Sequence, residues 1–337
     1  MKQIKHASQK GLSLVELMVA MTIGSILILG VIQVFLNSKQ TYSTNEALSR
    51  LQESGRFALQ FIVPDIRNAA SAISCRGNIK IHHTEENKIS PEDFATGLKG
   101  FSSENNKHGT SEAILLTSSD IIGSFEIKSG WKKENENLDI TESEENKLKA
   151  EGKKSAIPYG TVVFVSDGAN CDIFEQIEGK SDDEDEDEGN YKIKRSSHVG
   201  GPWQGTYSGK VDFMQIKSKK YLTRVSNKKP MLAREVSSLG KNSKVIEDLV
   251  EGIERISIRY GITKTQERKV SEYVNLSEVT DWDKVLSLRV SLLAVSPEKN
   301  LTKENVTVRF AGDDLTIPDG RLAQVFTTTI GIRNRLP

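Results

Sequence analysis

The N-terminal segment constrains the fold of this chain more than any other part of it. Residues 1–11 carry three lysines and no acidic residue, and the next 25 residues, Leu12 to Leu36, carry one charge, at Glu16. A helix of about 20 residues rises about 30 Å, which matches the hydrocarbon core of a bilayer. Leu17 to Leu36 is an uncharged run of that length. It predicts one membrane-spanning helix, with a cytoplasmic leader and an exported C-terminal bulk.

The apolar run has two other interpretations. One is a buried helix in a soluble core, where so long a run without charge is rare. The other is a cleaved secretory signal, whose apolar region is usually about 7–15 residues long and ends at a small-residue cleavage site. This run is longer, and it passes into Asn37-Ser38-Lys39 without such a site.

Glu16 needs a partner, because a lone carboxylate beside an apolar span is costly and is usually paired or functional. Its sequence neighbours include no Lys or Arg. Cleavage after Gly11 would create an α-amine on Leu12, four positions before Glu16 and within reach of its carboxylate. A carboxylate also suits the first turn of a helix, where the helix dipole is positive.

The sequence from Lys10-Gly11 to Leu17 resembles the class III (prepilin) signal of type IV pilins and type II secretion pseudopilins. The resemblance implies that a prepilin peptidase cuts between Gly11 and Leu12 and N-methylates Leu12, where most members have Phe. It also implies that Glu16 neutralises the amine of a neighbouring subunit during assembly.

A second helical segment follows the apolar run. From Thr44 to Ile66 the apolar residues recur at spacings of three, four and seven, which is one stripe of an amphipathic helix. Pro64 should kink or end it. We therefore expect a leader at 1–11, a long helix at 12–70 (12–36 in the membrane or filament core, 37–66 amphipathic), and a head at 71–337. A continuous helix from Leu12 to Val63 would be about 78 Å long.

The head is predicted to be rich in strands. Short apolar runs predict buried strands at 113–117 and 161–165, and alternation predicts half-buried strands at 256–260, 286–292 and 306–310, with a last strand at 326–332. No long helical period separates the C-terminal strands, so we expect antiparallel pairing. The predicted fold class is α+β, type IV pilin-like: a long N-terminal helix packed on a β-rich head with an antiparallel sheet.

Other segments of the head predict further elements. Residues 211–216 and 221–225 read as a hairpin, and residues 243–253 as a short helix with one apolar face. The polar segments at 132–154 and 180–190 are interpreted as surface insertions. In the first of them, Thr141 and Glu144 predict a capping box for a short exposed helix ending near Gly152.

The two cysteines, Cys75 and Cys171, lie in the part that would be exported, where disulfides persist. A Cys75–Cys171 bond would close a loop of about 100 residues and contribute about 4–5 kcal/mol on a chain-entropy model. Two buried thiols, or a metal pair with His82 or His83, are the alternatives. No ligand spacing resembles a structural zinc site, and we expect no metal and no cofactor.

Composition and motifs argue against several classes of function. With 46 basic and 46 acidic residues the formal net charge is zero, which excludes a strongly basic nucleic-acid binder. The acidic run Asp182–Glu188 lacks the Gly and the terminal Glu of an EF-hand loop. The chain has no G-x-S-x-G, no H-E-x-x-H and no phosphate-binding glycine loop. We therefore expect neither nucleic-acid binding nor catalysis.

Several later segments resemble the PilW-type minor pilins. They are Asp65-Ile66-Arg67 followed by Cys75, the stretch from Cys171 to Gln176, Leu249–Glu254 with Arg259-Tyr260-Gly261, and the C-terminal stretch from Arg321 to Arg335. These matches occur in order over most of the chain. The segments at 132–154 and 182–188 resemble nothing in that group.

The resemblance implies a structural minor pilin that helps initiate type IV pilus assembly within a priming complex at the filament tip. Its implied partners are other minor pilins, the major pilin, the prepilin peptidase, the inner-membrane assembly platform and a PilY-type tip adhesin. The protein would be a single-pass inner-membrane protein with a periplasmic head before assembly, and part of the pilus afterwards. The alternatives are a J-type pseudopilin of type II secretion and a membrane-anchored periplasmic binding protein or enzyme.

Overall fold

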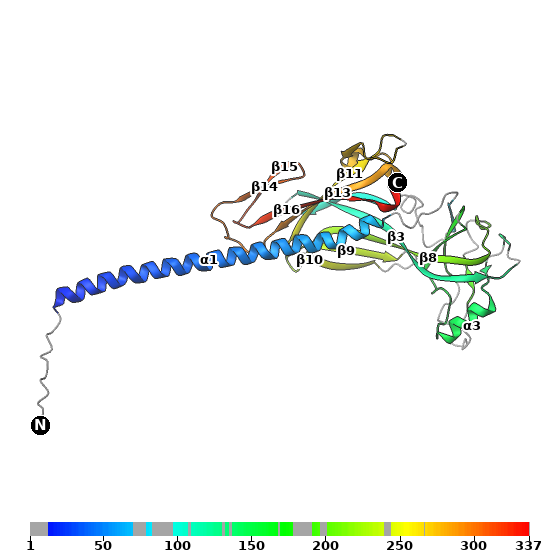
Figure 1. Cartoon of the computed structure of the whole chain (residues 1–337), viewed down its shortest axis with the longest axis horizontal. Helices are drawn as coiled ribbons and strands as arrows, with labels where there is room; N and C mark the ends of the chain where they lie inside the picture. Colours follow the sequence, from blue (N-terminus) through cyan, green and yellow to red (C-terminus); the bar gives the residue numbers. More distant parts are fainter. Residues whose placement is uncertain are drawn as a thin grey trace, which may run out of the picture.

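The computed structural model describes residues 13–69, 79–82, 97–106, 109–129, 132–134, 137–167, 169–177, 191–195, 201–238, 244–265 and 267–336. In this part of the chain one long helix extends from a β-rich head in which nearly all strand pairs are antiparallel (Figure 1). The predicted α+β, type IV pilin-like fold class is confirmed.

The long helix, α1 (Leu14–Arg67), is continuous over 54 residues, or about 81 Å at 1.5 Å per residue. Ser13 is its N-cap, and its hydroxyl accepts a hydrogen bond from the Glu16 N–H at 3.2 Å. Pro64 lies inside the helix, which ends at Arg67, within one turn of the proline. The first half of α1 projects beyond the head, and the second half lies along it (Figure 1).

The part of the head nearest α1 is built from two sheets with a shared core. A four-stranded sheet has the order β12 (Glu272–Val274), β11 (Ile253–Ile262), β13 (Val285–Val295), β16 (Ala323–Gly331). Strands β11, β13 and β16 contact α1, as does β10 (Lys244–Glu251) of the larger sheet. The buried residues Leu51, Ala58, Ile62 and Ile66 of α1 join the apolar faces of β11 and β13 in one cluster. The predicted alternation at 256–260 and 286–292 is confirmed, since Ile256, Ile258, Tyr260, Leu288, Val290 and Leu292 are all buried.

The larger sheet has eight strands, with the order β1-β6-β5-β8-β3-β2 and with β9 and β10 added along β8. Its two longest strands, β3 and β8, run from the α1 side of the head to a distal lobe that contains α3 (Figure 1). The distal lobe has its own cluster of buried side chains, including Phe125, Phe174, Trp203, Tyr207 and Phe213.

The strands of the large sheet are β1 (Ile79–His82), β2 (Leu98–Asn106), β3 (Gly109–Ile127), β5 (Val162–Ser166), β6 (Cys171–Glu175), β8 (Gly209–Ser226), β9 (Lys229–Ser238) and β10 (Lys244–Glu251). The remaining strands are β4 (Asn137–Leu138), β7 (Ile193–Lys194), β11 (Ile253–Ile262), β12 (Glu272–Val274), β13 (Val285–Val295), β14 (Val306–Phe310), β15 (Asp313–Ile317) and β16 (Ala323–Gly331). The other helices are α3 (Glu142–Ala150) and the 3-10 turns η1 (Leu276–Glu278), η2 (Trp282–Lys284) and η3 (Arg333–Arg335).

The predicted hairpin at 211–216 and 221–225 is wrong, because both segments belong to the single strand β8. The polar stretch between them contains no Gly, Pro or Asn that would favour a turn. The real turn is Asn227-Lys228, which joins β8 to β9. Both residues take positive φ, at 49° and 64°, as a two-residue type I′ hairpin requires.

The predicted helix at 243–253 is also wrong: this segment is β10 followed by the start of β11. The pairing of β10 with β9 shifts register between Asp248 and Val250. A bulge of this kind breaks the alternation of apolar residues and produces spacings that resemble a helical face. Gly252, with φ of 89°, then turns the chain into β11.

The predicted antiparallel pairing of the C-terminal strands is confirmed for β11, β13 and β16, while in the larger sheet β1 lies parallel to β6. One further prediction needs correction. The segment 132–154 is not merely a surface insertion, because Leu138, Ile140 and Leu148 are buried in the distal core. Its short helix is confirmed as α3, and Thr141 is the N-cap, but the Thr141 side chain makes no capping hydrogen bond. The acidic run lies outside the described residues.

Candidate functional site: the bare half of the N-terminal helix

The first half of α1 exposes a continuous apolar surface. Every large aliphatic side chain from Leu14 to Leu36 is exposed, and most have about half or more of their surface free. This helix is long and apolar enough to cross a membrane, judged by length and composition alone. Such a surface marks a lipid or protein contact, because soluble monomers rarely expose apolar patches of this size.

Glu16 lies in the first turn of α1 and is exposed. Its carboxylate sits near the N–H groups that no intrahelical acceptor satisfies, where the helix dipole favours a negative charge. Gly11 and Leu12, the residues predicted to flank the cleavage site, lie outside the described residues. The assembly role of Glu16 and the processing at Gly11 and Leu12 therefore stay predictions.

The second half of α1 is fixed to the head by close packing. Gly55 lies against the ring of Phe326 on β16, and a Cβ added at position 55 would collide with Phe326 Cε2. Glycine is needed here for a close approach and not for an unusual backbone angle. Polar contacts extend the attachment towards the N-terminus: the Gln40 amide donates to the Leu301 carbonyl at 3.1 Å, and Arg50 pairs with Glu298 at 3.1 Å.

The C-terminal end of α1 is held by a second set of polar contacts. The Tyr221 hydroxyl donates to Asp65 Oδ2 at 2.6 Å, and Lys219 Nζ lies 2.8 Å from Asp65 Oδ1. Burial, followed by the hydrogen bond to Asp65, raises the pKa of the Tyr221 phenol, so it stays protonated and remains a donor. Asp65 belongs to one of the segments on which the PilW resemblance was based, and this contact gives it a structural role.

Another contact joins two residues of the same resemblance. Arg321 Nη1 lies 2.7 Å from Glu254 Oε1, and the side chains are only 12% and 6% exposed. The pair ties the start of β11 to the turn that precedes β16. Because both charges are largely removed from water, removal of one partner would leave a buried charge. Both residues lie in segments on which the PilW resemblance was based, but their pairing was not predicted.

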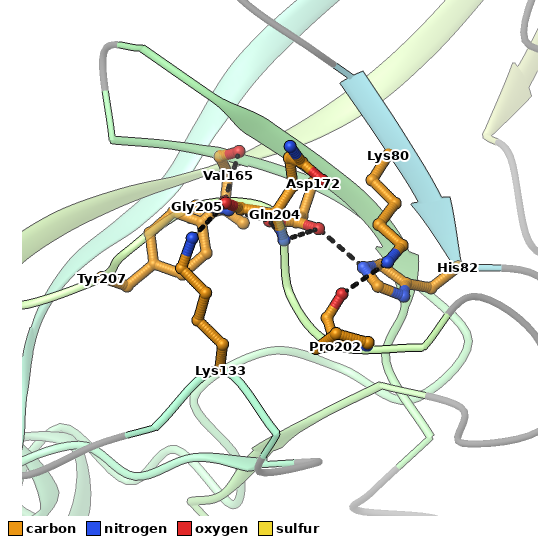
Figure 2. A network of polar contacts seen from close by, with 9 residues as sticks. All are labelled: Lys80, His82, Lys133, Val165, Asp172, Pro202, Gln204, Gly205 and Tyr207. Carbon is orange, nitrogen blue, oxygen red and sulfur yellow. Dashed lines mark hydrogen bonds and ion pairs between the residues drawn. The ribbon is translucent and has the colours of Figure 1, made fainter.

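The distal lobe contains a buried polar network centred on Asp172 that sequence reasoning missed (Figure 2). The carboxylate accepts hydrogen bonds from His82 Nε2 and the Tyr207 hydroxyl, both at 2.6 Å. It also accepts from the backbone N–H groups of Gln204, at 3.0 Å, and Gly205, at 2.9 Å. Asp172 and His82 have no exposed surface. One side chain thus joins β6, β1 and the loop at 201–207.

These contacts set the charge of the network. Burial raises the pKa of the Asp172 carboxyl, but the hydrogen bonds from His82, Gly205, Tyr207 and Gln204 outweigh burial and hold that pKa below its usual range. Burial and the adjacent carboxylate raise the pKa of the Tyr207 phenol. Asp172 is therefore a charged acceptor surrounded by hydrogen-bond donors, which is an arrangement suited to holding a loop. The sequence signal for it was an acid flanked by Cys171 and the apolar pair Ile173-Phe174.

The loop at 201–207 has further supports. Lys80 Nζ donates to the Pro202 carbonyl at 2.7 Å, and Lys133 Nζ donates to the Gln204 carbonyl at 2.8 Å (Figure 2). The buried Trp203 ring packs edge-on against Phe174, with centroids 5.0 Å apart. The network contains no exposed nucleophile, and its members are hydrogen-bonded to one another.

The remaining site predictions concern cysteine and metal. Cys171 is fully buried and disulfide-bonded. Its predicted partner Cys75 lies outside the described residues, as does His83, and the Cys75–Cys171 pairing stays a prediction. His82 is bound to Asp172. Among the described residues, no group of three or more His, Cys, Asp or Glu side chains could hold a metal ion.

Comparisons with known proteins gave two family matches and a similar solved structure. Residues 220–334 match the family described as type IV pilus-assembly protein W, and residues 6–32 match the prokaryotic N-terminal methylation motif. No curated protein matches the chain. A solved type IV-like pilin from Thermus thermophilus is similar at 14% identity over 58% of this chain and 98% of that chain, with a TM-score of 0.25, which is too low to define a fold.

The two family matches support a PilW-type minor pilin, and the resemblance found in the sequence is confirmed. The chain is therefore pilin-like at its N-terminal segment and over its C-terminal third. Its N-terminal helix and methylation motif indicate a membrane-anchored pilin.

Proposed function

We propose that this protein is a structural minor pilin that helps initiate type IV pilus assembly as part of a priming complex at the filament tip. The observation that carries the proposal is the bare first half of α1: an uncharged apolar helix surface, with Glu16 in its first turn, on a chain that matches the pilus-assembly protein W family. The head leaves this surface uncovered, so lipid or another protein chain must cover it.

The proposed sequence of events follows from the chemistry of the segment. The precursor is held in the inner membrane by residues 12–36, with residues 1–11 in the cytoplasm and residues 71–337 as a periplasmic head. Prepilin peptidase hydrolyses the Gly11–Leu12 peptide bond with one water, and the new amine then takes a methyl group from a methyl-donor cosubstrate and loses a proton. The helix then leaves lipid for the filament core, where its aliphatic surface contacts the helices of other pilins and stays out of water.

Glu16 sets the register in this proposal. Once the helix is in an apolar core, an unpaired carboxylate would be strongly disfavoured. Pairing with the Leu12 amine of a neighbouring subunit neutralises both charges, and a register shift would leave both unpaired. The partners are other minor pilins, the major pilin, the peptidase, the inner-membrane platform and a PilY-type adhesin at the tip. The role is structural and needs no catalytic group, metal or cofactor.

The test is a comparison of Glu16→Ala with Glu53→Ala. Glu53 is an exposed acid on the same helix but in the half that lies along the head. We expect Glu16→Ala to leave the head folded and to impair piliation and co-purification with other pilins, whereas Glu53→Ala retains both. Normal piliation with Glu16→Ala would contradict the proposed role of Glu16. If deletion of the gene stopped protein secretion but left the pili intact, the result would instead support the pseudopilin alternative.

Processing is tested separately by the intact mass of the membrane-extracted protein. A chain that starts at Leu12, with or without one added methyl group, supports the proposal. A chain that starts at Met1, in cells that contain the peptidase, contradicts it.

A further inference from the structure

We propose that the loop at residues 297–304 lies in the phospholipid headgroup layer while α1 spans the membrane, so that the head touches the bilayer at a defined place before assembly. This inference rests on the proposed membrane-anchored precursor. It assigns a lipid contact to a segment of the head that is remote in sequence from the membrane helix.

The level of the loop along α1 is fixed by contacts to Gln40. The Gln40 amide donates to the Leu301 carbonyl at 3.1 Å and to the Asn300 carbonyl at 3.4 Å. The uncharged run ends at Leu36, and four residues further along a helix is about 6 Å. A bilayer of about 40–45 Å with a core of about 30 Å has a headgroup layer of about 5–8 Å on each side. When Leu17 to Leu36 fills the core, the loop therefore lies within that layer.

The loop is held rigidly, so it does not fold back from the membrane. The N–H of Asn300 donates to the Asp319 carbonyl at 2.9 Å, and the N–H groups of Leu301 and Thr302 donate to the Gly320 carbonyl at 2.9 and 3.0 Å. Gly320 has φ of 58°, and a Cβ there would be 2.5 Å from the Thr302 carbonyl oxygen. Backbone pairing and this close approach fix the loop on the head.

A second anchor holds the same loop on α1. Arg50 on α1 pairs with Glu298 at 3.1 Å, which also offsets the charge of that carboxylate. The Leu301 side chain is buried beneath the loop. The edge of the head that faces the bare half of α1 is therefore preformed (Figure 1).

The side chains of this edge suit headgroups better than hydrocarbon. Lys303 and Glu304 are exposed, and the Lys299 side chain is 64% exposed beside Asp319. Phospholipid headgroups present phosphate to the lysines and, in phosphatidylethanolamine, ammonium to the carboxylates. None of the exposed large apolar side chains of the described chain lies between residues 297 and 320. The edge is therefore polar and of mixed charge, and lysine stems can reach phosphate while the backbone stays outside the core.

The experiment uses nitroxide labels on the full-length, unprocessed chain in vesicles of phosphatidylethanolamine and phosphatidylglycerol. Labels are attached under non-reducing conditions to three single variants: Lys303→Cys in the loop, Lys154→Cys after α3 in the distal lobe, and Leu27→Cys at the middle of the apolar run. Collision rates with oxygen, which partitions into lipid, and with a water-soluble nickel complex report the depth of each label.

We expect label 27 in hydrocarbon, label 154 in bulk water, and label 303 at headgroup depth, with nickel accessibility several-fold lower than at 154. Equal nickel accessibility at 303 and 154, with label 27 in hydrocarbon, overturns the loop contact and leaves the membrane anchor intact. A label at 27 that is open to nickel overturns the membrane-anchored precursor and the loop contact with it. Residues 303 and 154 are both exposed, so neither label disturbs packing.

Discussion

Replacing Asp172 with alanine should destabilise the distal lobe by about 3–5 kcal/mol. The change deprives four donors of their acceptor: His82 Nε2, the Tyr207 hydroxyl, and the N–H groups of Gln204 and Gly205. Each buried donor left unpaired costs about 1–3 kcal/mol. Water entering the space left by the carboxylate would satisfy some of them, which keeps the total well below the simple sum.

Asp172→Asn separates acceptor geometry from charge. An amide oxygen at the Oδ2 position would still accept from Gly205 and Tyr207, and its NH2 group could donate to His82 Nε2 if that imidazole changes tautomer. Only the charge assistance is lost, so we expect a cost of about 1–2 kcal/mol. Alanine should therefore be at least twice as destabilising as asparagine.

The assay is urea unfolding of the full-length chain in detergent, followed by tryptophan fluorescence, to which the buried Trp203 contributes. Asp167→Ala is the matched control, because Asp167 accepts from Thr206 N–H at 2.9 Å and from two more N–H groups but is exposed. It should cost about 1 kcal/mol or less. The reasoning is refuted if Asp172→Ala costs no more than this control. A cost for Asp172→Asn equal to that of Asp172→Ala would show that charge, and not the number of acceptors, holds the loop.

Three further predictions concern the docking of α1, the Arg321–Glu254 pair and the pH dependence of stability. Gly55→Ala should destabilise the docking of α1 by about 1–3 kcal/mol in the same urea assay, because the new methyl group would collide with Phe326. Arg321→Ala should cost about 3 kcal/mol, because it leaves the buried carboxylate of Glu254 without this partner. Stability should also fall below about pH 4: Asp172 has a depressed pKa in the folded state, so its contribution is present above the usual Asp pKa and is lost as the pH falls through the folded value.

Each of these predictions has its own control. If Gly55→Ala instead gains about 1 kcal/mol, helix propensity outweighs the contact and Phe326 moves aside easily. For Arg321 the comparison is Lys299→Ala, which removes the exposed pair with Asp319 and should cost about 1 kcal/mol or less. For the acid transition, Asp172→Asn should flatten the pH dependence below pH 4, and an unchanged profile would assign that dependence to other carboxylates.

The sequence predicted those parts of the fold whose signal is local and periodic. The apolar run and the stripe at 44–66 predicted α1 to within a few residues, and alternation at 256–260 and 286–292 predicted β11 and β13. The errors occurred where one residue changes the period. The bulge between Asp248 and Val250 gave the apolar residues of β10 the spacing of a helix. In β8 a short polar run separates two apolar stretches and was predicted to be a turn, although the strand continues through it.

Contacts between residues far apart in the chain could not be predicted from a single sequence. Gly55 makes room for a ring 271 positions further along the chain, a contact that no local pattern predicts. Asp172, Tyr207 and His82 come from three segments, and nothing in their spacing joins them. At the processing and assembly site the reverse holds: Gly11, Leu12 and Glu16 were found from a local motif, and the fold adds only that the helix beside them is bare.

The way α1 is attached also determines how the protein would respond to mechanical load. Its second half lies lengthwise along the head, in contact with β16, β13 and β10 (Figure 1). A pull along the helix axis would shear this whole seam at once, from Gln40 to Asp65, and would not peel it open contact by contact. The Asp172 network lies in the distal lobe, whose core is separate from this seam, so the lobe could vary in sequence without weakening the joint.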